Sequence, residues 1–399
     1  MIKQTISLIA ASSLLLCCGA DWDQFRGPNA QSVAVGADLP TDWNVDSNVG
    51  WRKDLPGRGP SGPIVVDGRV FVTCSSGSQQ EQLHVVCFDA KSGDQLWHRQ
   101  IWANGRTMTH PTSSTAAPTP ASDGKHIFAF YSSNDLVCYD LDGNLQWYRA
   151  LGKDHPKAGN DIGMSSSPVV ASGTVVVQVE NQGDSFAAGI DVETGQDRWR
   201  IDRQQIANWT SPVIMQTPSG IDLVVLKSSQ GVTARDIQTG DEVWSYDVGA
   251  DGIPSMVADG DKLYLPADTF AVLQINGNKP EELWASNQVR PGPASPIIGN
   301  GNVYALAKNI LSCSDAESGN QKWKLRLGGD YWSTPVLAGG HMYCVNLDGV
   351  THVVDVSGEK GKIVSKPDIG ETVQSSPAVY DNALFIRSDT ALWKITKNQ

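Results

Sequence analysis

The sequence predicts an all-β fold, an eight-bladed β-propeller made of four-stranded antiparallel blades. Three observations lead to this prediction: a tryptophan motif that recurs about every 40 to 50 residues, a proline that recurs with it, and tight-turn dipeptides between short apolar segments. Repeats of this length are typical of propeller and solenoid folds. Helical periodicity is almost absent, so we expect the repeating unit to be a set of strands.

The tryptophan motif is Asp-x3-Gly-x3-Trp, and its first copy is FDAKSGDQLW at residues 88–97. Full copies end at Trp97, Trp199, Trp244 and Trp323, a copy one residue shorter ends at Trp147, and a looser copy ends at Trp284. These tryptophans follow one another at intervals of 50, 52, 45, 40 and 39 residues. Because the motif repeats, we expect it to be architectural: the Asp caps a turn, the Gly adopts a left-handed conformation, and the Trp packs on the next blade.

The second pattern is a short run of small residues followed by proline at the start of each unit. The prolines are Pro63, Pro118, Pro168, Pro212, Pro254, Pro296, Pro335 and Pro377. Small residues suit the innermost strand, where the blades converge, and proline suits a strand that has one unpaired edge. Eight such positions predict eight blades.

Each unit then consists of four short strands in a fixed order. In the first unit, apolar residues 64–66 form the inner strand and Asp67-Gly68 forms a hairpin turn. A second strand follows, a third runs into the motif Asp, and the fourth carries the motif Trp. Four antiparallel strands repeated in tandem are typical of propeller blades.

The ring is expected to close through a strand from the N-terminal side. The eighth unit, residues 375–395, supplies only three strands, whereas residues 49–55 form an isolated strand pattern with its own Trp51. We therefore expect this strand to complete the last blade, so that one propeller domain spans residues 48–396. The seventh unit has Val364 where a Trp is expected. We predict the weakest inter-blade packing there, beside the blade closed by Trp51.

The N-terminus has the order of a secretory signal: Lys3, an apolar run over residues 6–16, and small residues up to Ala20. We predict a signal peptide over residues 1–20 and a periplasmic or secreted protein, since the apolar run is too short to cross a bilayer. Adjacent Cys17 and Cys18 leave open an outer-membrane lipoprotein, although the small residue expected before a lipidated cysteine is missing.

Residues 21–47 form a leader between the predicted signal and the propeller. Trp22, Phe25 and Trp43 make it apolar enough that we expect it to dock on the ring rather than hang free. The whole chain has a formal net charge of −12, and loss of residues 1–20 would make it −13. An acidic chain repels phosphate backbones, so nucleic-acid binding is disfavoured. We expect a monomer with no membrane span.

The cysteines and histidines do not form a metal-binding pattern. Cys87, Cys138 and Cys313 each lie two residues before a motif Asp, a packing position within a strand. A disulfide between Cys74 and Cys87 remains open from sequence. The seven histidines show no paired metal spacing. The sequence therefore predicts no catalytic, metal-binding or cofactor-binding residue.

The repeated motif, preceded by a strand and followed by Ser-Ser-Pro, resembles the tryptophan-docking repeat of pyrroloquinoline-quinone (PQQ)-type propellers. The resemblance covers nearly all of the chain after residue 20. The segments DWDQFRGPN (residues 21–29) and LPTDW (residues 39–43) resemble the leader of secreted PQQ-like propeller proteins from planctomycete-type bacteria.

Two families share this repeat, and they imply different functions. Quinoprotein alcohol dehydrogenases hold PQQ and calcium on the propeller axis, whereas BamB-like outer-membrane assembly lipoproteins have no cofactor and act through surface contacts. We favour a non-enzymatic interaction or scaffold propeller. The chain is much shorter than the enzymes, its only adjacent cysteine pair lies in the predicted signal peptide, and no set of acidic residues stands out as a calcium cage. The alternative is a PQQ-dependent dehydrogenase that acts on alcohols or sugars.

The strand order predicts a functional face. The inter-blade connections and the turns after the second strands share one face, and loops on a rigid scaffold commonly carry binding residues. We predict that this face binds an extracytoplasmic protein or glycan. The candidate residues are His110, Asn134, Asn181, Trp209, Lys227, Arg290, Lys308, Tyr331, Trp332, Asn346, Gln374 and Arg387.

Overall fold

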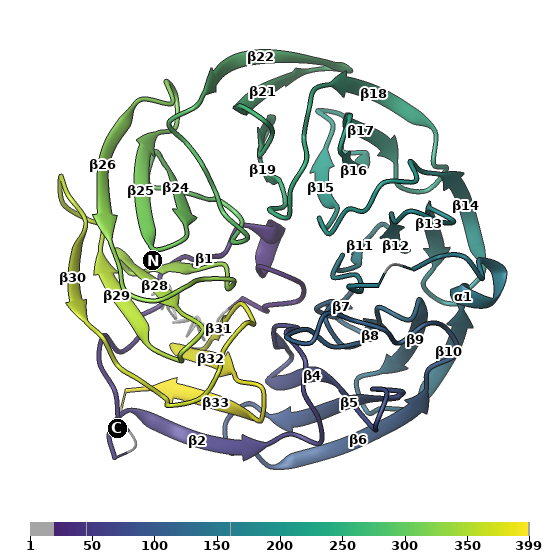
Figure 1. The fold of residues 1–399 in the computed structure, drawn as a ribbon, viewed down its shortest axis with the longest axis horizontal. Helices are drawn as coiled ribbons and strands as arrows, with labels where there is room; N and C mark the ends of the chain where they lie inside the picture. Colours follow the sequence, from purple (N-terminus) through teal and green to yellow (C-terminus); the bar gives the residue numbers. More distant parts are fainter. Residues whose placement is uncertain (1–19, 45, 160, 398–399) are drawn as a thin grey trace, which may run out of the picture.

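A computed structural model describes residues 20–44, 46–159 and 161–397. These residues form a closed ring of eight antiparallel blades around a central axis (Figure 1), which confirms the predicted fold. Within the described residues, helix is limited to η1 (Pro28–Ala30) and α1 (Leu151–Asp154).

The strands of each blade follow one another outward from the axis. Blade 1 contains β3 (Ile64–Val66), β4 (Arg69–Ser76), β5 (Gln82–Asp89) and β6 (Gln95–Trp102). Blade 2 contains β7 (Ala121–Ser122), β8 (His126–Phe130), β9 (Asp135–Asp140) and β10 (Leu145–Ala150). Blade 3 contains β11 (Val169–Ala171), β12 (Thr174–Val179), β13 (Phe186–Asp191) and β14 (Asp197–Asp202). Blade 4 contains β15 (Val213–Gln216), β16 (Asp222–Ser228), β17 (Gly231–Asp236) and β18 (Glu242–Asp247).

The second half of the ring repeats this order. Blade 5 contains β19 (Val257–Asp259), β20 (Lys262–Leu265), β21 (Phe270–Asn276) and β22 (Lys279–Ser286). Blade 6 contains β23 (Ile297–Gly299), β24 (Asn302–Ala307), β25 (Ile310–Asp315) and β26 (Gln321–Arg326). Blade 7 contains β27 (Val336–Ala338), β28 (His341–Val345), β29 (Thr351–Asp355) and β30 (Lys362–Ser365), with β1 (Val33–Ala34) pairing parallel to β27.

Blade 8 is completed by the N-terminal strand, as the sequence predicts. It contains β31 (Ala378–Tyr380), β32 (Ala383–Arg387), β33 (Ala391–Thr396) and, outermost, β2 (Val49–Asp54). The strand β2 pairs antiparallel with β33, and Arg52 lies opposite Trp393. The two ends of the domain are therefore joined in one sheet.

The recurring motif forms a latch between neighbouring blades. In blade 1, Asp89 Oδ1 accepts hydrogen bonds from the backbone N–H groups of Lys91 and Ser92, at 2.9 and 2.7 Å, and Gly93 has a φ of +74°. A Cβ at Gly93 would lie 2.7 Å from the ring of Trp51, so only glycine lets the ring approach. The Trp51 indole N–H donates to the carbonyl of Ala90 at 3.3 Å. The tryptophan of blade 8 is thus docked on the turn of blade 1.

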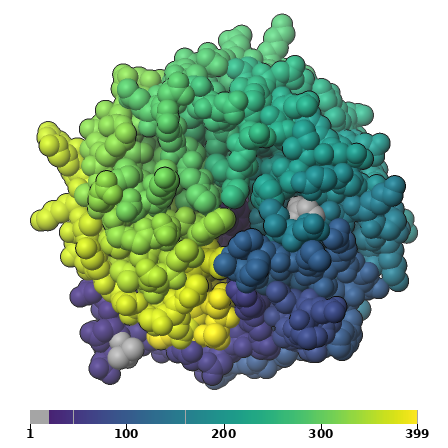
Figure 2. All heavy atoms as spheres, viewed as in Figure 1, coloured from purple at the N-terminus to yellow at the C-terminus, as the bar shows by residue number. Residues whose placement is uncertain are grey.

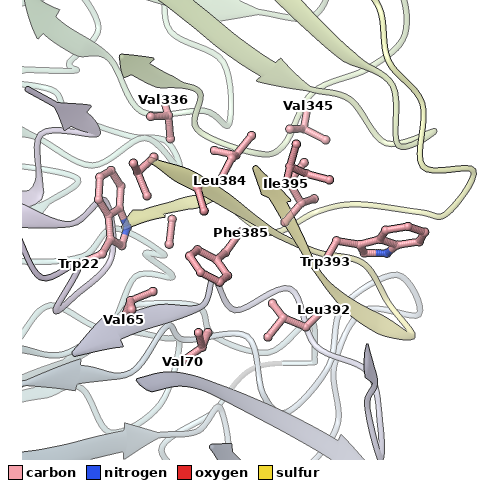
Figure 3. Packing of buried hydrophobic residues seen from close by; sticks show 14 of the residues in the cluster. Trp22, Val65, Val70, Val336, Val345, Leu384, Phe385, Leu392, Trp393 and Ile395 are labelled. Atoms are coloured by element: carbon pink, nitrogen blue, oxygen red, sulfur yellow. The ribbon is translucent and has the colours of Figure 1, made fainter. Parts of the chain in front are cut away.

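In the part of the chain that the structure describes, the core consists of seven buried clusters that lie between neighbouring blades. The largest one joins blades 7, 8 and 1 (Figure 3). The weak packing expected beside Val364 stays a prediction, because the size of a cluster does not rank the interfaces. Leu39 and Trp43 of the leader lie in this cluster together with Tyr343 of blade 7 and Ile395 of blade 8. The leader therefore supplies an indole to an interface whose own blade lacks one.

The leader crosses the face of the ring that carries the tight turns after the inner strands. Trp22 and Val65 exchange two backbone hydrogen bonds of 2.8 and 2.9 Å at blade 1. The chain then passes the axis, where Arg26 donates to the carbonyl of Met256 in blade 5, and reaches blade 7 through β1. In Figure 1 this purple segment lies across the middle of the ring.

All five cysteines in the described residues are free and buried. Cys74 lies opposite His84 and Cys87 lies opposite Phe71 in the β4–β5 pair, so the two thiols are not cross-strand neighbours. Burial raises the pKa of the Cys87 thiol to about 12. These residues act as small apolar side chains, and the Cys74–Cys87 disulfide is not formed.

Candidate functional site: a neutral cup on the propeller axis

A ring of hydroxyl groups surrounds the axis. In each of blades 1 to 7, one residue at the start of the inner strand donates its backbone N–H to the side-chain hydroxyl of the equivalent residue in the next blade, at 2.9–3.1 Å. The acceptors are Thr119, Ser167, Ser211, Ser255, Ser295, Thr334 and Ser376. This hydroxyl ring ties neighbouring blades together at their narrowest point.

The hydroxyl ring also corrects the predicted register of two blades. Thr119 is the equivalent residue in blade 2 and Ser255 in blade 5. In the other blades the residue after the ring position is the recurring proline. In blade 2 this residue is Pro120 and not the predicted Pro118, and in blade 5 it is Met256 and not the predicted Pro254. Prolines next to the true position misled the alignment of these two blades.

The hydroxyl ring is open at one step, between blades 8 and 1. The blade 1 residue is Gly62, which has no hydroxyl, and a Cβ there would lie only 2.7 Å from the carbonyl oxygen of Ser376. Arg387 bridges this step instead: its Nη1 donates to the carbonyl of Ser61 at 2.9 Å and also to the Ser61 hydroxyl. Burial lowers the pKa of the Arg387 guanidinium.

Above the hydroxyl ring is a cup of about 330 Å³ that opens on the face of the inter-blade connections. Its wall is the seven hydroxyl residues, its floor includes Phe25 of the leader, and its mouth carries Trp209, Trp332 and Ile162. Figure 2 shows the hollow at the centre of this face, with the purple leader at its bottom. No side chain that lines the cup is an acid, a lysine or an arginine.

Two long connections cover one side of the mouth. They are residues 103–120, between blades 1 and 2, and residues 151–159 and 161–168, between blades 2 and 3, which include α1. The His110 N–H donates to the carbonyl of Ile162 at 3.2 Å, and Arg106 pairs with Asp161 at 2.8 Å. Gln374 donates to the carbonyl of Thr112 at 2.6 Å, which joins this cover to the connection between blades 7 and 8.

The structure brings four of the predicted site residues together at the cup: His110, Trp209, Trp332 and Gln374. Trp209 is held in place because its indole N–H donates to the carbonyl of Gly163 at 3.0 Å. Trp332 is 48% exposed. Whether these side chains contact a partner remains a prediction.

Six other candidates have buried side chains and do not belong to the accessible face. They are Asn134, Asn181, Lys227, Tyr331, Asn346 and Arg387. The physical reason is that the inter-blade connections fold over the turns after the second strands. Asn134 donates to the carbonyl of Ala158 at 3.2 Å, and Lys227 donates to the carbonyl of Pro254 at 3.3 Å. Burial lowers the pKa of Lys227 to about 8.

The remaining buried candidates hold turns in the same way. Asn181 accepts from the N–H of Gly183 at 2.6 Å, Asn346 donates to the carbonyl of Gly328 at 3.3 Å, and Tyr331 contacts His352 through its hydroxyl at 2.8 Å. Arg290 and Lys308 are exposed, but neither lines the cup. Arg290 lies instead at a neighbouring groove with Asp251 and Asp268.

Sequence reasoning missed the hydroxyl ring and the floor of the cup. The hydroxyl residues were recognised only as small residues before proline, although a hydroxyl at that place recurs in most repeats. Phe25 could not be placed, because nothing in the repeat pattern indicates where the leader crosses the ring.

The cup does not fit the calcium ion of the dehydrogenases. Calcium takes about six to eight oxygen ligands, of which carboxylates are the most common charged type. The cup offers hydroxyl groups but no carboxylate, either for a metal or for a catalytic base. In the part of the chain that the structure describes, no group of three or more His, Cys, Asp or Glu residues could hold a metal ion. No helix among these residues is long and apolar enough to cross a membrane.

Comparison with known proteins agrees with the geometry of the ring. The family model described as outer membrane protein assembly factor BamB matches residues 32–200, 84–263 and 268–387. BamB of Yersinia pestis is 23% identical over 249 residues, which are 60% of this chain and 58% of that protein. BamB of Moranella endobia is 21% identical over 325 residues, 76% of this chain and 77% of that protein.

Solved structures show the same fold in proteins of different function. The crystal structure of BamB from Moraxella catarrhalis has a TM-score of 0.66 at 15% identity and covers 88% of this chain and 98% of that one. A europium-containing methanol dehydrogenase has a TM-score of 0.71 at 14% identity, with coverages of 92% and 89%. The ring is common to both, and the family match covers most of the sequence. The chain therefore belongs to the family of the outer membrane protein assembly factor BamB, a family of PQQ-like β-propellers.

Proposed function

We propose that this chain is a non-enzymatic interaction propeller that binds an extracytoplasmic protein through the face around the cup. The observation that carries the proposal is the set of exposed apolar side chains on this face. Trp332 is 48% exposed, Met108 is 55% exposed and Ile206 is 42% exposed, and all three lie on inter-blade connections. Exposed apolar side chains on the loops of a rigid scaffold are typical of protein interaction sites.

The match to BamB proteins supports the same proposal, because their name describes a factor in outer membrane protein assembly. An assembly factor acts through contacts with other proteins. For this chain, we expect an extracytoplasmic location on the basis of the predicted signal peptide, of which residues 1–19 lie outside the described residues. A glycan partner would use the same aromatic side chains, so it is an outcome to be distinguished by experiment.

The test is a triple substitution of Met108, Ile206 and Trp332 by serine, with capture of partners from the extracytoplasmic fraction and titration of the captured protein. The matched control replaces Leu96, Leu145 and Leu283, which are 48%, 57% and 48% exposed on outer strands, by serine. We expect the first variant to lose at least about tenfold in affinity and the control to bind normally. Equal binding by both folded variants would show that the binding site does not include these three residues. Binding to a glycan array that is lost with the first variant would identify a glycan instead.

The dehydrogenase alternative has a direct test. The purified protein is mixed with PQQ and calcium, and reduction of a dye by alcohols and sugars is followed. Because the cup has no carboxylate for calcium or for proton abstraction, we expect no substrate-dependent reduction. Dye reduction that requires both PQQ and an alcohol would establish the enzyme.

A further inference from the structure

The hydroxyl ring has hydrogen-bond donors that the fold does not use. Each of the seven hydroxyl oxygens accepts a backbone N–H from the preceding blade. A hydroxyl also has one proton to donate. Among the described residues, none of these seven protons has an acceptor, and all seven residues line the cup. The wall of the cup is therefore rich in donors and suits a ligand group that accepts hydrogen bonds.

A buried cation lies beneath the floor of the cup. Arg26 is 1% exposed, and its guanidinium lies 5.2 Å from the centre of the Phe25 ring, which forms part of the floor. Its Nη2 donates to the carbonyl of Met256 at 2.6 Å, and Met256 directly follows Ser255 of the hydroxyl ring. Arg26 therefore directly follows one residue that lines the cup, Phe25, and donates to the residue that directly follows another, Ser255. Burial lowers the pKa of Arg26 to about 9, so it is still protonated at neutral pH.

This cation has no counter-ion in the described part of the chain. Its Nε and Nη1 have no hydrogen-bond partner, and Arg26 forms no ion pair there. Asp23, the acid nearest to Arg26 in the sequence of the leader, has a pKa raised to about 6, chiefly by burial. Buried charges are normally paired, because an isolated charge in a low-dielectric interior is costly. The protein as a whole is acidic, so a positive potential on the axis has to come from buried cations near it, which are Arg26 beneath the floor and Arg387 at the open step of the hydroxyl ring.

We propose that the axial cup binds a ligand that carries a carboxylate next to an apolar group. The carboxylate lies among the ring hydroxyls above Phe25, in the field of Arg26, and the apolar group contacts Trp209 and Trp332 at the mouth. A volume of about 330 Å³ is at the small end for ligand pockets and admits one short ligand. A free carboxylic acid and the C-terminal residue of a polypeptide share this chemistry. The inference does not depend on protein docking around the cup.

The first test uses two small probes of similar shape, indole-3-acetate and its neutral amide, in which an NH2 group replaces one carboxylate oxygen. Binding to the full-length protein is measured by calorimetry. We expect the acid to bind at least about tenfold more tightly than the amide. The variant Arg26→Met is expected to reduce the affinity for the acid to that of the amide, and to leave the amide unchanged. Equal affinity of the wild-type protein for both probes would overturn the proposal.

A matched control separates the local field from the overall charge. Arg106→Met removes one positive charge from an exposed arginine on the connection over the mouth, where the side chain is 48% exposed and paired with Asp161. We expect this variant to bind the acid normally, since exposed charges are screened. If it loses as much affinity as Arg26→Met, net charge explains the binding and the proposal fails.

Two further measurements keep the test decisive. Arg26→Lys preserves the charge and is expected to retain most of the affinity for the acid, so a folded Arg26→Lys variant that binds no acid also contradicts the proposal. The dipeptide N-acetyl-Ala-Trp, with a free or an amidated C-terminus, then identifies the source. Tighter binding of the free-acid dipeptide than of indole-3-acetate indicates a polypeptide C-terminus, and the reverse indicates a free carboxylic acid.

Discussion

The interface between blades 7 and 8 and the interface between blades 4 and 5 each lack one half of the tryptophan latch. At the 7/8 interface the indole is missing, because Val364 occupies the place of the motif Trp. At the 4/5 interface the indole of Trp244 is present, but blade 5 has a short hairpin at residues 276–279 instead of the Asp-x3-Gly turn.

The outcome differs between the two interfaces. Trp43 of the leader lies in the buried cluster of blades 7 and 8, so an indole from elsewhere in the chain fills the space. At the 4/5 interface the indole N–H of Trp244 has no hydrogen-bond partner, and a cavity of about 130 Å³ remains beside its ring. A missing apolar group can be replaced by any side chain that reaches the gap, whereas a missing carbonyl must come from a turn at one fixed place.

The largest expected effect is at the 7/8 interface. Trp43→Ala removes a side chain that is 3% exposed and leaves a cavity in the largest cluster. We expect a loss of about 3–5 kcal/mol in the free energy of unfolding, measured by urea denaturation. Trp332→Ala is the control, because Trp332 is 48% exposed and should change stability by less than about 1 kcal/mol. Equal losses in the two variants would show that the leader does not support this interface.

The second effect concerns the 4/5 interface at its inner edge. Ser255→Ala removes the acceptor of the Ser211 N–H, which it contacts at 2.9 Å, and so leaves a buried donor unpaired. The cost is expected to be about 1–3 kcal/mol. Because the outer latch is also incomplete there, we expect faster hydrogen exchange in the adjacent strands β15 and β19.

The matched variant for this comparison is Ser167→Ala, which removes the acceptor of the Thr119 N–H at 3.0 Å, between blades 2 and 3. There the outer latch is complete, since the Trp147 indole N–H donates to the carbonyl of Val192 at 2.8 Å. Exchange in the neighbouring inner strands should rise less than in the Ser255→Ala variant. Equal increases would mean that the latch and the hydroxyl ring stabilise the blades independently.

The repeat made the ring predictable, because Asp, Gly and Trp have positions set by local turn geometry and blade contact. The strand at residues 49–55 was also predictable, since an isolated strand with Trp51 completes a unit that lacks one. The path of the leader was not. Trp43 and Phe25 lie far in sequence from their contacts, and no period relates them to the blades.

The site was harder to predict than the ring for a physical reason. A polar residue after a strand has the same pattern whether it meets solvent or holds a connection above it. Asn134 and Lys227 belong to the second kind, and the structure buries them beneath residues 158 and 254. Trp209 and Trp332 were predicted because the connections between blades place them near the axis and aromatic residues are common in protein interfaces, and both line the cup.

The smallest expected effect isolates the indole hydrogen bond itself. Trp97 and Trp244 are both buried motif tryptophans, but the Trp97 N–H donates to the carbonyl of Leu141 at 2.9 Å, whereas that of Trp244 has no partner. Replacement by phenylalanine removes a similar apolar area at both sites and the hydrogen bond only at Trp97. We expect Trp97→Phe to cost about 0.5–1.5 kcal/mol more than Trp244→Phe in urea unfolding. If Trp244→Phe is the more costly variant, a water or a relaxed backbone group already pairs with that indole, and the 4/5 interface is not the incomplete one.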